Sequence, residues 1–153
     1  MTRKQEIALE AFRTGFNCAQ SVISVFVDQL GYNYEQAMQT ASGFGRGMGK
    51  LQATCGAATG AFMVIGLYTS GRYPDISVQK VKNNEIIQAF NKQFMEQMGA
   101  RKCIDILGVD LSTREGQLKF EEDQLKSKVC EKCVATAVNI LEELLELENF
   151  SGQ

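Results

Sequence analysis

The sequence predicts an all-α protein, a single-domain bundle of about five to seven helices with a glycine-rich loop before a helix that begins at Cys55. Apolar residues recur at spacings of three and four along most of the chain, no period-two alternation is sustained, and Pro74 is the single proline. The 153 residues are enough to bury an ordinary apolar core. No repeat, low-complexity tract or linker divides them, so we expect one domain over residues 1–153.

Three helices are expected ahead of the loop. Thr2 is a suitable N-cap for a first helix over about 2–12. A second helix over about 17–31 ends at a glycine and carries Cys18 on its core-facing side. The third helix is expected to follow over about 33–42, capped by the asparagine at its start.

The middle of the chain predicts a loop and two helices. Glycine occupies every second position over residues 43–49, which indicates a loop or a helix end with close backbone approach. An apolar helix over about 55–67 follows, and a turn at 71–74 ends it. A long helix over about 75–98 comes next. The residues expected on its buried stripe are Val81, Ile86, Ala89, Phe90 and Phe94.

The last third begins with a short apolar turn at Cys103, and residues 110–113 predict a turn and cap before the next helical segment. A final helix is expected over about 129–148. The residues expected to face inward on it are Val134, Ala137, Val138, Leu141, Leu144 and Leu145.

Charge and hydropathy exclude several classes of protein. The net charge is -2 and no basic stretch is dense enough to follow a phosphate backbone, so we expect no nucleic-acid partner. No apolar run approaches the roughly 20 residues of a membrane span, and residues 1–13 lack the features of a secretory signal. We therefore expect no membrane insertion and a cytoplasmic location, where cysteines are reduced and serve catalysis or ligation.

The chain has five cysteines and no histidine. Without imidazole, the Ser-His-Asp and Cys-His hydrolase templates and Cys2His2 zinc sites are excluded. The glycine-rich loop does not match a nucleotide-binding P-loop, because Phe44 and Leu51 stand where glycine and a hydroxyl residue are needed. Sulfur chemistry remains, either thiol redox or thiolate ligation of a metal.

Cys55 is the best candidate for a reactive sulfur. It stands at the expected start of a helix, where free backbone N–H groups and the helix dipole stabilise a thiolate. Gly56 and Ala57 add little bulk, so a second sulfur, a substrate or a cluster could approach. Arg46 and Lys50 could raise the local positive potential, although a solvated loop edge is the simpler interpretation. The alternative for Cys55 itself is a small buried residue in tight helix packing.

Several segments together resemble a known family. They are Phe16-Asn17-Cys18-Ala19-Gln20-Ser21, the glycine-rich loop, Cys55-Gly56-Ala57-Ala58-Thr59-Gly60, Cys103 and Cys130. This order resembles the C_GCAxxG_C_C family of redox-active proteins over nearly the whole chain. The resemblance implies a small redox-active protein whose four characteristic cysteines are Cys18, Cys55, Cys103 and Cys130. Within its motif, Gly56, Ala57 and Gly60 are where a substrate or cofactor would approach the backbone.

The fifth cysteine completes the sequence Cys130-Glu131-Lys132-Cys133 at the expected start of the last helix. This spacing is found in redox dithiols and in halves of metal sites, but the βαβ context of a thioredoxin is missing. We expect Cys130 to belong to the site and Cys133 to be a structural residue.

Three functions remain open. In the first, Cys55 reacts, one of Cys18, Cys103 or Cys130 resolves the product, and an unidentified redox partner supplies or takes electrons. In the second, the four family cysteines ligate an iron-sulfur cluster or zinc in an electron-transfer or metal-binding module. The third is a helical interaction module, which could form a homodimer through the last helix and would have inert, mutually distant sulfurs. The first two require the four sulfurs to converge.

Overall fold

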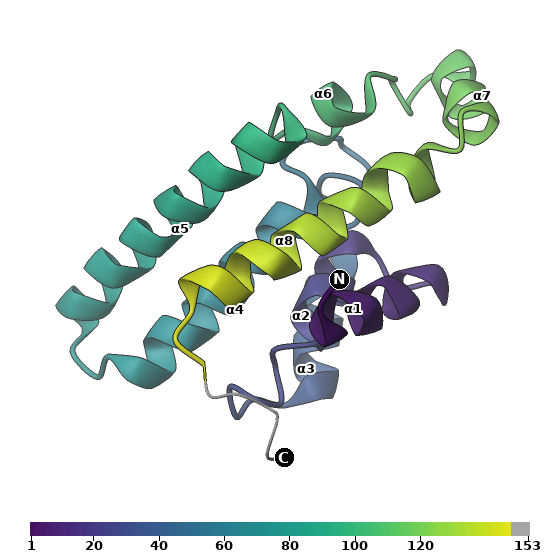
Figure 1. Ribbon diagram of the computed structural model, residues 1–153. Helices are drawn as coiled ribbons and strands as arrows, with labels where there is room; N and C mark the ends of the chain where they lie inside the picture. The colour runs from purple at the N-terminus through teal and green to yellow at the C-terminus, as the bar shows by residue number, and fades with distance from the viewer. Residues whose placement is uncertain (148–153) are drawn as a thin grey trace.

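The computed structural model describes residues 1–147 and contains, over these residues, eight α-helices and no β-strand (Figure 1). The helices are α1 (Arg3–Arg13), α2 (Cys18–Ser24), α3 (Tyr34–Thr40), α4 (Gly56–Arg72), α5 (Ile76–Met98), α6 (Cys103–Leu107), α7 (Arg114–Glu122) and α8 (Glu131–Leu144). A 3-10 turn at Ala41–Gly43 and a π-helical turn at Lys126–Cys130 adjoin α3 and α8. The all-α prediction is confirmed. The helices outnumber the expected five to seven because short segments, such as the apolar turn at Cys103, form regular helical turns.

The first three helices begin at the predicted caps. The side chains of Thr2, Asn17 and Asn33 each accept a hydrogen bond from the backbone N–H three residues on. The second helix is shorter than predicted. Phe26 and Gly31 donate their backbone N–H groups to carbonyls three residues back, so the chain tightens into turns after α2.

The small residues of α4 allow it to pack closely within the bundle. Every residue from 56 to 61 is buried, and α4 contacts α2, α5 and α8. At Gly60, an added Cβ would lie 2.7 Å from the backbone oxygen of Ala19 on α2, so only glycine fits there without displacing that helix. In the part of the chain described, no helix combines the length and apolarity needed to cross a membrane.

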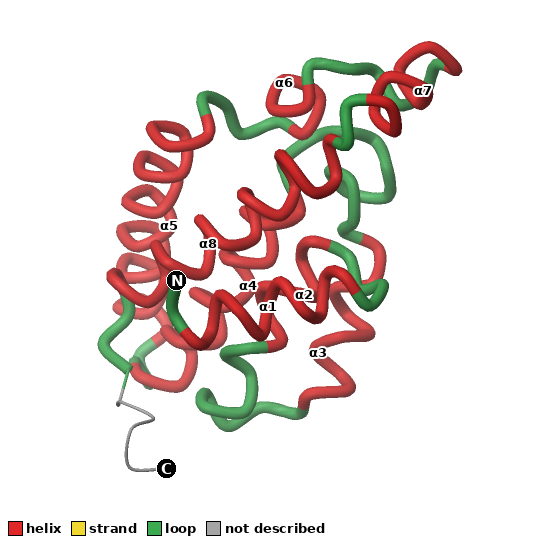
Figure 2. Tube along the Cα trace, turned by 45° about the vertical axis from the view of Figure 1, so that its right-hand side comes forward, coloured by secondary structure: helices red, strands yellow, loops and turns green. Residues whose placement is uncertain are grey.

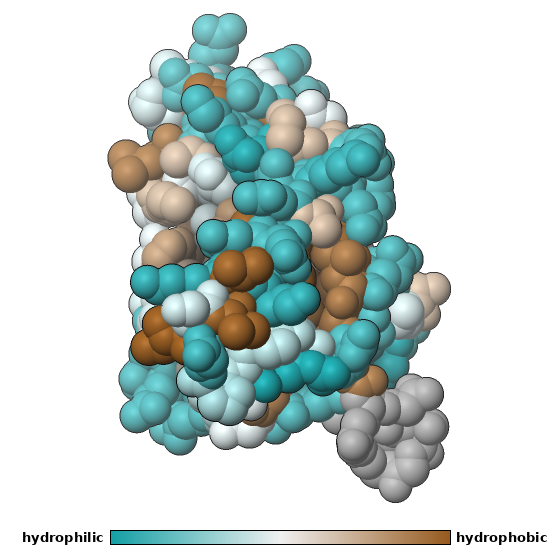
Figure 3. All heavy atoms as spheres, turned by 90° about the vertical axis from the view of Figure 1, so that its left-hand side faces the viewer, coloured by the Kyte–Doolittle hydropathy of each residue, from teal (hydrophilic) through white to brown (hydrophobic). Residues whose placement is uncertain are grey.

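The long α5 is buried toward its C-terminal end only. Phe90 and Phe94 are fully buried and their rings stack with centroids 5.6 Å apart, as the predicted stripe requires. Val81 was expected on the same stripe, but it is 56% exposed. The prediction for Val81 is wrong because no neighbouring helix covers this side of α5, where Ile76 and Val78 are also exposed. Figure 3 views this face, on which apolar side chains gather in patches.

The apolar side of α8 is used inside the bundle. Val134, Ala137, Val138, Leu141 and Leu145 are buried as predicted, against α1, α2, α4 and α5. These contacts occupy the apolar surface through which the sequence suggested a homodimer. The helix ends at residue 144, and the expected end at Glu148 lies outside the described residues.

One end of the molecule is formed by short elements. Figures 1 and 2 show α6 and α7 together at one end of the bundle, past the C-terminal end of α5 and near the start of α8. The segment after the glycine-rich loop reaches the same end and pairs with the start of α6. The Cys55 N–H donates to the Arg101 carbonyl at 2.9 Å, and the Cys103 N–H donates to the Ala53 carbonyl at 2.7 Å.

Candidate functional site

All five cysteines line one small cavity, which we call the cysteine pocket. Its lining consists of Cys18, Arg46, Gly47, Cys55, Gly56, Cys103, Ile106, Leu107, Cys130 and Cys133. Every cysteine in it is buried and free. The cavity volume is about 10 Å³, room for roughly one water molecule. The four cysteines that the sequence singled out therefore meet at one place, together with the fifth.

Different elements bring these sulfurs together. Cys18 and Cys103 are the first residues of α2 and α6, and Cys55 is the N-cap of α4. Cys130 ends the π-helical turn, and Cys133 follows in the first turn of α8. A spacing of three residues places the last two on one side of the helix. The pocket is thus formed by the starts of three helices and one side of a fourth.

A short backbone pairing fixes Cys55 beside Cys103. Thr54 and Lys102 form an isolated antiparallel bridge, and the two cysteines on either side of it donate the backbone hydrogen bonds described above. This contact joins two segments far apart in the sequence. It orients the N-cap of α4 and the first residue of α6 toward the same cavity.

The glycine-rich loop has a left-handed backbone. Residues 46–50 all have positive φ, including Arg46, Met48 and Lys50 at 53°, 66° and 65°. For residues with a side chain this conformation costs roughly 1–2 kcal/mol each. A Cβ on Gly47 would lie 2.7 Å from backbone atoms of residues 52 and 53, so the predicted close approach occurs there. Hydrogen bonds from Lys50 to Gly45 and from Gln52 to Arg46, 3.0 and 3.1 Å long, hold the loop.

Gln52 is a buried polar residue beside the pocket that the sequence analysis missed. Its amide nitrogen donates to the Val109 carbonyl at 2.9 Å and lies 4.0 Å from the Cys103 sulfur. Its amide oxygen accepts from the Leu111 backbone at 2.7 Å. Gln52 therefore fastens the chain after α6 to the glycine-rich loop and helps to hold Cys103 in place.

Cys55 and Cys133 line the same pocket and have opposite pKa shifts. The Cys133 thiol lowers the pKa of Cys55 by donating to its sulfur. Burial opposes this effect, and the backbone N–H groups of Ala57 and Ala58 add to it. The pKa of Cys133 is raised by the same hydrogen bond and by burial. Cys55 is therefore the sulfur that ionises, and Cys133 is the one that keeps its proton.

The other three cysteines have raised pKa values. Burial raises the pKa of Cys103 to about 12 and that of Cys130 to about 11, and it raises the pKa of Cys18 well above its ordinary value. Arg46 partly offsets burial at all three. The sequence suggested that Arg46 favours a thiolate at Cys55, but its charge acts on the other cysteines instead. Lys50 does not line the cysteine pocket.

The three small motif residues have different positions. Gly56 lines the pocket, and a Cβ there would lie 3.0 Å from the Cys18 Cβ. Ala57 is fully buried and acts on Cys55 through its backbone N–H. Gly60 does not line the cavity and instead packs against Ala19. Of the three, Gly56 is the one beside the space that a substrate could approach.

The metal-binding alternative finds no support in the arrangement of the described side chains. Over residues 1–147, no group of three or more cysteine, aspartate or glutamate side chains is arranged to hold a metal ion. A cavity of about 10 Å³ is also too small for an iron-sulfur cluster. Because the sulfurs gather in one pocket, they also lack the mutual distance expected of an inert interaction module.

A comparison with models of known protein families shows which family the chain belongs to. A sequence model described as "Putative redox-active protein (C_GCAxxG_C_C)" matches residues 16–144. The chain belongs to this family. The matched region includes all five cysteines and the glycine-rich loop. No curated protein and no solved structure matches the chain.

Membership of the C_GCAxxG_C_C family supports a redox role in general terms. The four family cysteines all line the pocket, and Cys133 lines it as well. The sequence analysis expected Cys133 to be structural; the residue lies on the pocket, and its thiol lowers the pKa of Cys55. Its spacing of three residues from Cys130 was the signal, because a helix that turns one of these sulfurs toward a cavity brings the other near it.

Proposed function

We propose that the protein is a thiol redox protein in which Cys55 is the reactive thiolate and Cys133 the resolving thiol. The observation that carries the proposal is that Cys55, at the N-cap of α4, and Cys133 line the same small buried cavity, with a lowered pKa on Cys55 and a raised pKa on Cys133. A thiolate is the nucleophile in thiol-disulfide exchange, and its partner must lie within bonding reach. The sequence suggested Cys18, Cys103 or Cys130 for the second role, and the opposite pKa shifts of Cys55 and Cys133 favour Cys133.

The proposed reaction is exchange with a disulfide. The Cys55 thiolate attacks one sulfur of the substrate, the substrate S–S bond breaks, and a mixed disulfide and one free thiolate result. Cys133 then loses its proton, which the departing thiolate takes up, and attacks the Cys55 sulfur. The second half of the substrate leaves as a thiolate, so two electrons pass to the substrate and a Cys55–Cys133 disulfide remains. In the opposite direction, a dithiol partner reduces this bond.

The remaining cysteines stay protonated during these steps. Raised pKa values keep Cys103 and Cys130 as thiols near neutral pH, and Cys18 behaves in the same way. They form an apolar wall around the reactive pair and leave Cys55 as the one proposed thiolate in the pocket. The cysteine usage favours the reducing cytoplasm as the place of this reaction.

Thiol counting with peptide mapping tests the proposal. The reduced chain, purified without oxygen, is treated with a mild disulfide oxidant, and the free thiols and linked peptides are measured before and after addition of a reductant. We expect reversible loss of two thiols and a peptide pair joined through Cys55 and Cys133. The Cys133→Ser variant should stop at the mixed disulfide, whereas Cys18→Ser should still close the bond.

Two results would contradict the proposal. One is a chain whose thiols resist the oxidant while it stays folded by circular dichroism. The other is near-stoichiometric iron with acid-labile sulfide, or near-stoichiometric zinc, in the same preparation, because the cysteines would then be ligands.

A further inference from the structure

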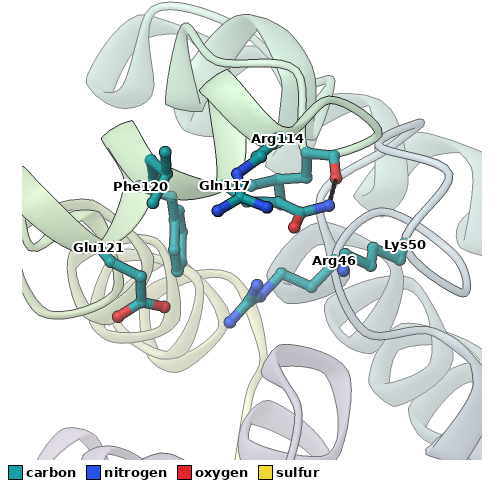
Figure 4. A pocket seen from close by; sticks show the side chains of 8 residues that line it. Arg46, Lys50, Arg114, Gln117, Phe120 and Glu121 are labelled. Atoms are coloured by element: carbon teal, nitrogen blue, oxygen red, sulfur yellow. Dashed lines mark hydrogen bonds between the residues drawn. The ribbon is translucent and has the colours of Figure 1, made fainter.

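A second cavity adjoins the cysteine pocket. It has a volume of about 360 Å³, in the range of small-molecule sites. Its lining consists of Arg46, Lys50, Leu111, Arg114, Gln117, Leu118, Phe120 and Glu121, and we call it the basic cavity. Figure 4 shows the Arg46 and Lys50 side chains entering from the glycine-rich loop, with Arg114, Phe120 and Glu121 on the α7 side. The cavity therefore lies between the loop and α7.

The basic cavity carries an excess of positive charge. Three cations and one carboxylate line it, although the whole chain has a net charge of -2. None of Arg46, Lys50 and Arg114 forms an ion pair with a carboxylate among residues 1–147. Cations gathered around a concave site and left without protein partners favour an anionic ligand.

Arg46 is held in a position suited to such a ligand. Its guanidinium lies over the Phe120 ring, 4.3 Å from the ring centroid. This contact uses the flat face of the guanidinium and fixes its orientation. The N–H groups at the edge of the guanidinium have no hydrogen-bond partner among the described residues. They can therefore donate two parallel hydrogen bonds to a carboxylate or a phosphate.

Arg46 also connects the two cavities, since it lines both of them. A ligand whose anionic group contacts Arg46 therefore lies beside the cysteines. Gln117 supports the opposite wall, where its amide nitrogen donates to the Leu111 carbonyl at 2.9 Å, the bond drawn in Figure 4.

We propose that the basic cavity binds the anionic part of a low-molecular-weight disulfide and thereby presents its sulfurs to Cys55. The inference rests on the proposed thiol redox function and names the substrate class for that site. The bonds made and broken are those already described: each turnover breaks the S–S bond of the ligand, forms the Cys55–Cys133 bond and releases two anionic thiols.

The test compares disulfides that differ in charge. The reduced full-length chain is mixed with glutathione disulfide, which carries carboxylates, with coenzyme A disulfide, which carries phosphates, with neutral bis(2-hydroxyethyl) disulfide and with cationic cystamine. Loss of free thiol gives a rate constant for each. We expect at least one anionic disulfide to react about tenfold faster than the neutral one, with a rate that falls as salt is added. The faster of the two anionic probes identifies the preferred anion.

A matched pair of variants locates the effect. Arg114→Gln removes a cation that lines the basic cavity, and Lys119→Gln removes one from the same helix that does not line it. Arg114→Gln should slow the anionic disulfide about three- to fivefold, as expected for one solvent-screened charged contact, and leave the neutral one unchanged. Lys119→Gln should change neither rate by more than about twofold. Equal rates for all four disulfides, or slowing of the neutral and anionic probes alike by Arg114→Gln, would overturn the inference and leave the redox function intact.

A binding measurement separates the two proposals. S-methylglutathione has the carboxylates of glutathione but no reactive sulfur, so its binding by calorimetry needs no redox chemistry. If no disulfide oxidises the chain, the proposed function fails. Binding of this probe, or of inorganic phosphate, that is weakened by Arg114→Gln and not by Lys119→Gln would still support the cavity as an anion site, and absence of binding by both would reject it.

Discussion

Cys133 in the first turn of α8 and Cys55 at the N-cap of α4 line the same small buried pocket, where the Cys133 thiol lowers the pKa of Cys55. The two buried sulfurs have opposite pKa shifts, lowered for Cys55 and raised for Cys133. The pair therefore combines a ready nucleophile with a thiol that becomes nucleophilic only after its proton has left.

Removal of the Cys133 thiol should make Cys55 less reactive. In Cys133→Ala, Cys55 loses the donor that lowers its pKa, so a smaller fraction is thiolate at neutral pH. We expect alkylation of the Cys55 peptide by iodoacetamide at pH 7 to slow roughly tenfold, the effect of one hydrogen bond to a charged group. Cys133→Ser, which keeps a donor, should recover part of the rate. Unchanged alkylation in Cys133→Ala would show that the pair is not coupled.

Stability should fall in alkaline solution. Burial raises the pKa of Cys103 from 9.0 to about 12 and that of Cys130 from 9.0 to about 11. An acid whose pKa is raised by folding stabilises the folded state fully below its unfolded pKa, and this contribution is lost as pH rises above that value. The free energy of unfolding should therefore decline above about pH 9, by about 1.4 kcal/mol per pH unit for each such cysteine.

Urea unfolding between pH 7 and pH 10.5 measures this decline. The Cys130→Ala variant is the control, because its slope above pH 9 should be smaller by the share of one cysteine, whatever its stability at pH 7. A free energy of unfolding that does not change between pH 8 and pH 10.5 would contradict the raised pKa values.

Two glycines of α4 should respond oppositely to alanine. At Gly60 an added Cβ would lie 2.7 Å from the Ala19 oxygen, so Gly60→Ala should destabilise the fold by about 1–3 kcal/mol. At Gly66 nothing lies within 4 Å of the added atom, so Gly66→Ala should stabilise it by up to about 1 kcal/mol. Thermal unfolding of both variants checks the difference, and equal effects would mean that the crossing of α2 and α4 is looser than described.

Loss of the Gln52 amide should destabilise the site. Gln52→Leu leaves the Val109 carbonyl and the Leu111 N–H without their partner, at a cost of about 1–3 kcal/mol for each buried group left unsatisfied. Gln117→Leu is a matched control, since Gln117 is exposed and bonds a single carbonyl. Urea denaturation should show the larger loss for Gln52→Leu, and a smaller loss there than in the control would refute its anchoring role.

The sequence predicted features that depend on local chemistry. The structure confirms three predicted N-caps, Thr2, Asn17 and Asn33. A short polar side chain just before an amphipathic segment can accept a hydrogen bond from a backbone N–H of the first helical turn, so the local sequence is enough to predict it. Cys18, Cys55, Cys103 and Cys130 could be selected by their order around the glycine-alanine motif. In each case the information lies within a few residues or in a family pattern.

Features that depend on tertiary contacts could not be predicted in the same way. Gln52 resembles any polar loop residue until its partners at Val109 and Leu111 are known. Val81 has the spacing of a buried residue, but no other helix reaches its side of α5. Cys133 was underestimated because its partner, Cys55, is on another helix.

The small volume of the cysteine pocket limits which oxidation products its thiols can form. Conversion of a thiol to sulfinic or sulfonic acid adds oxygen atoms one after another, and each needs space beside the sulfur and water to solvate the acid. A cavity of about 10 Å³ provides neither. When a peroxide oxidises Cys55 to a sulfenic acid, the Cys133 sulfur already lies in the same pocket, whereas another peroxide molecule would first have to enter it. The enclosure therefore favours the reversible disulfide over irreversible sulfinic and sulfonic acids.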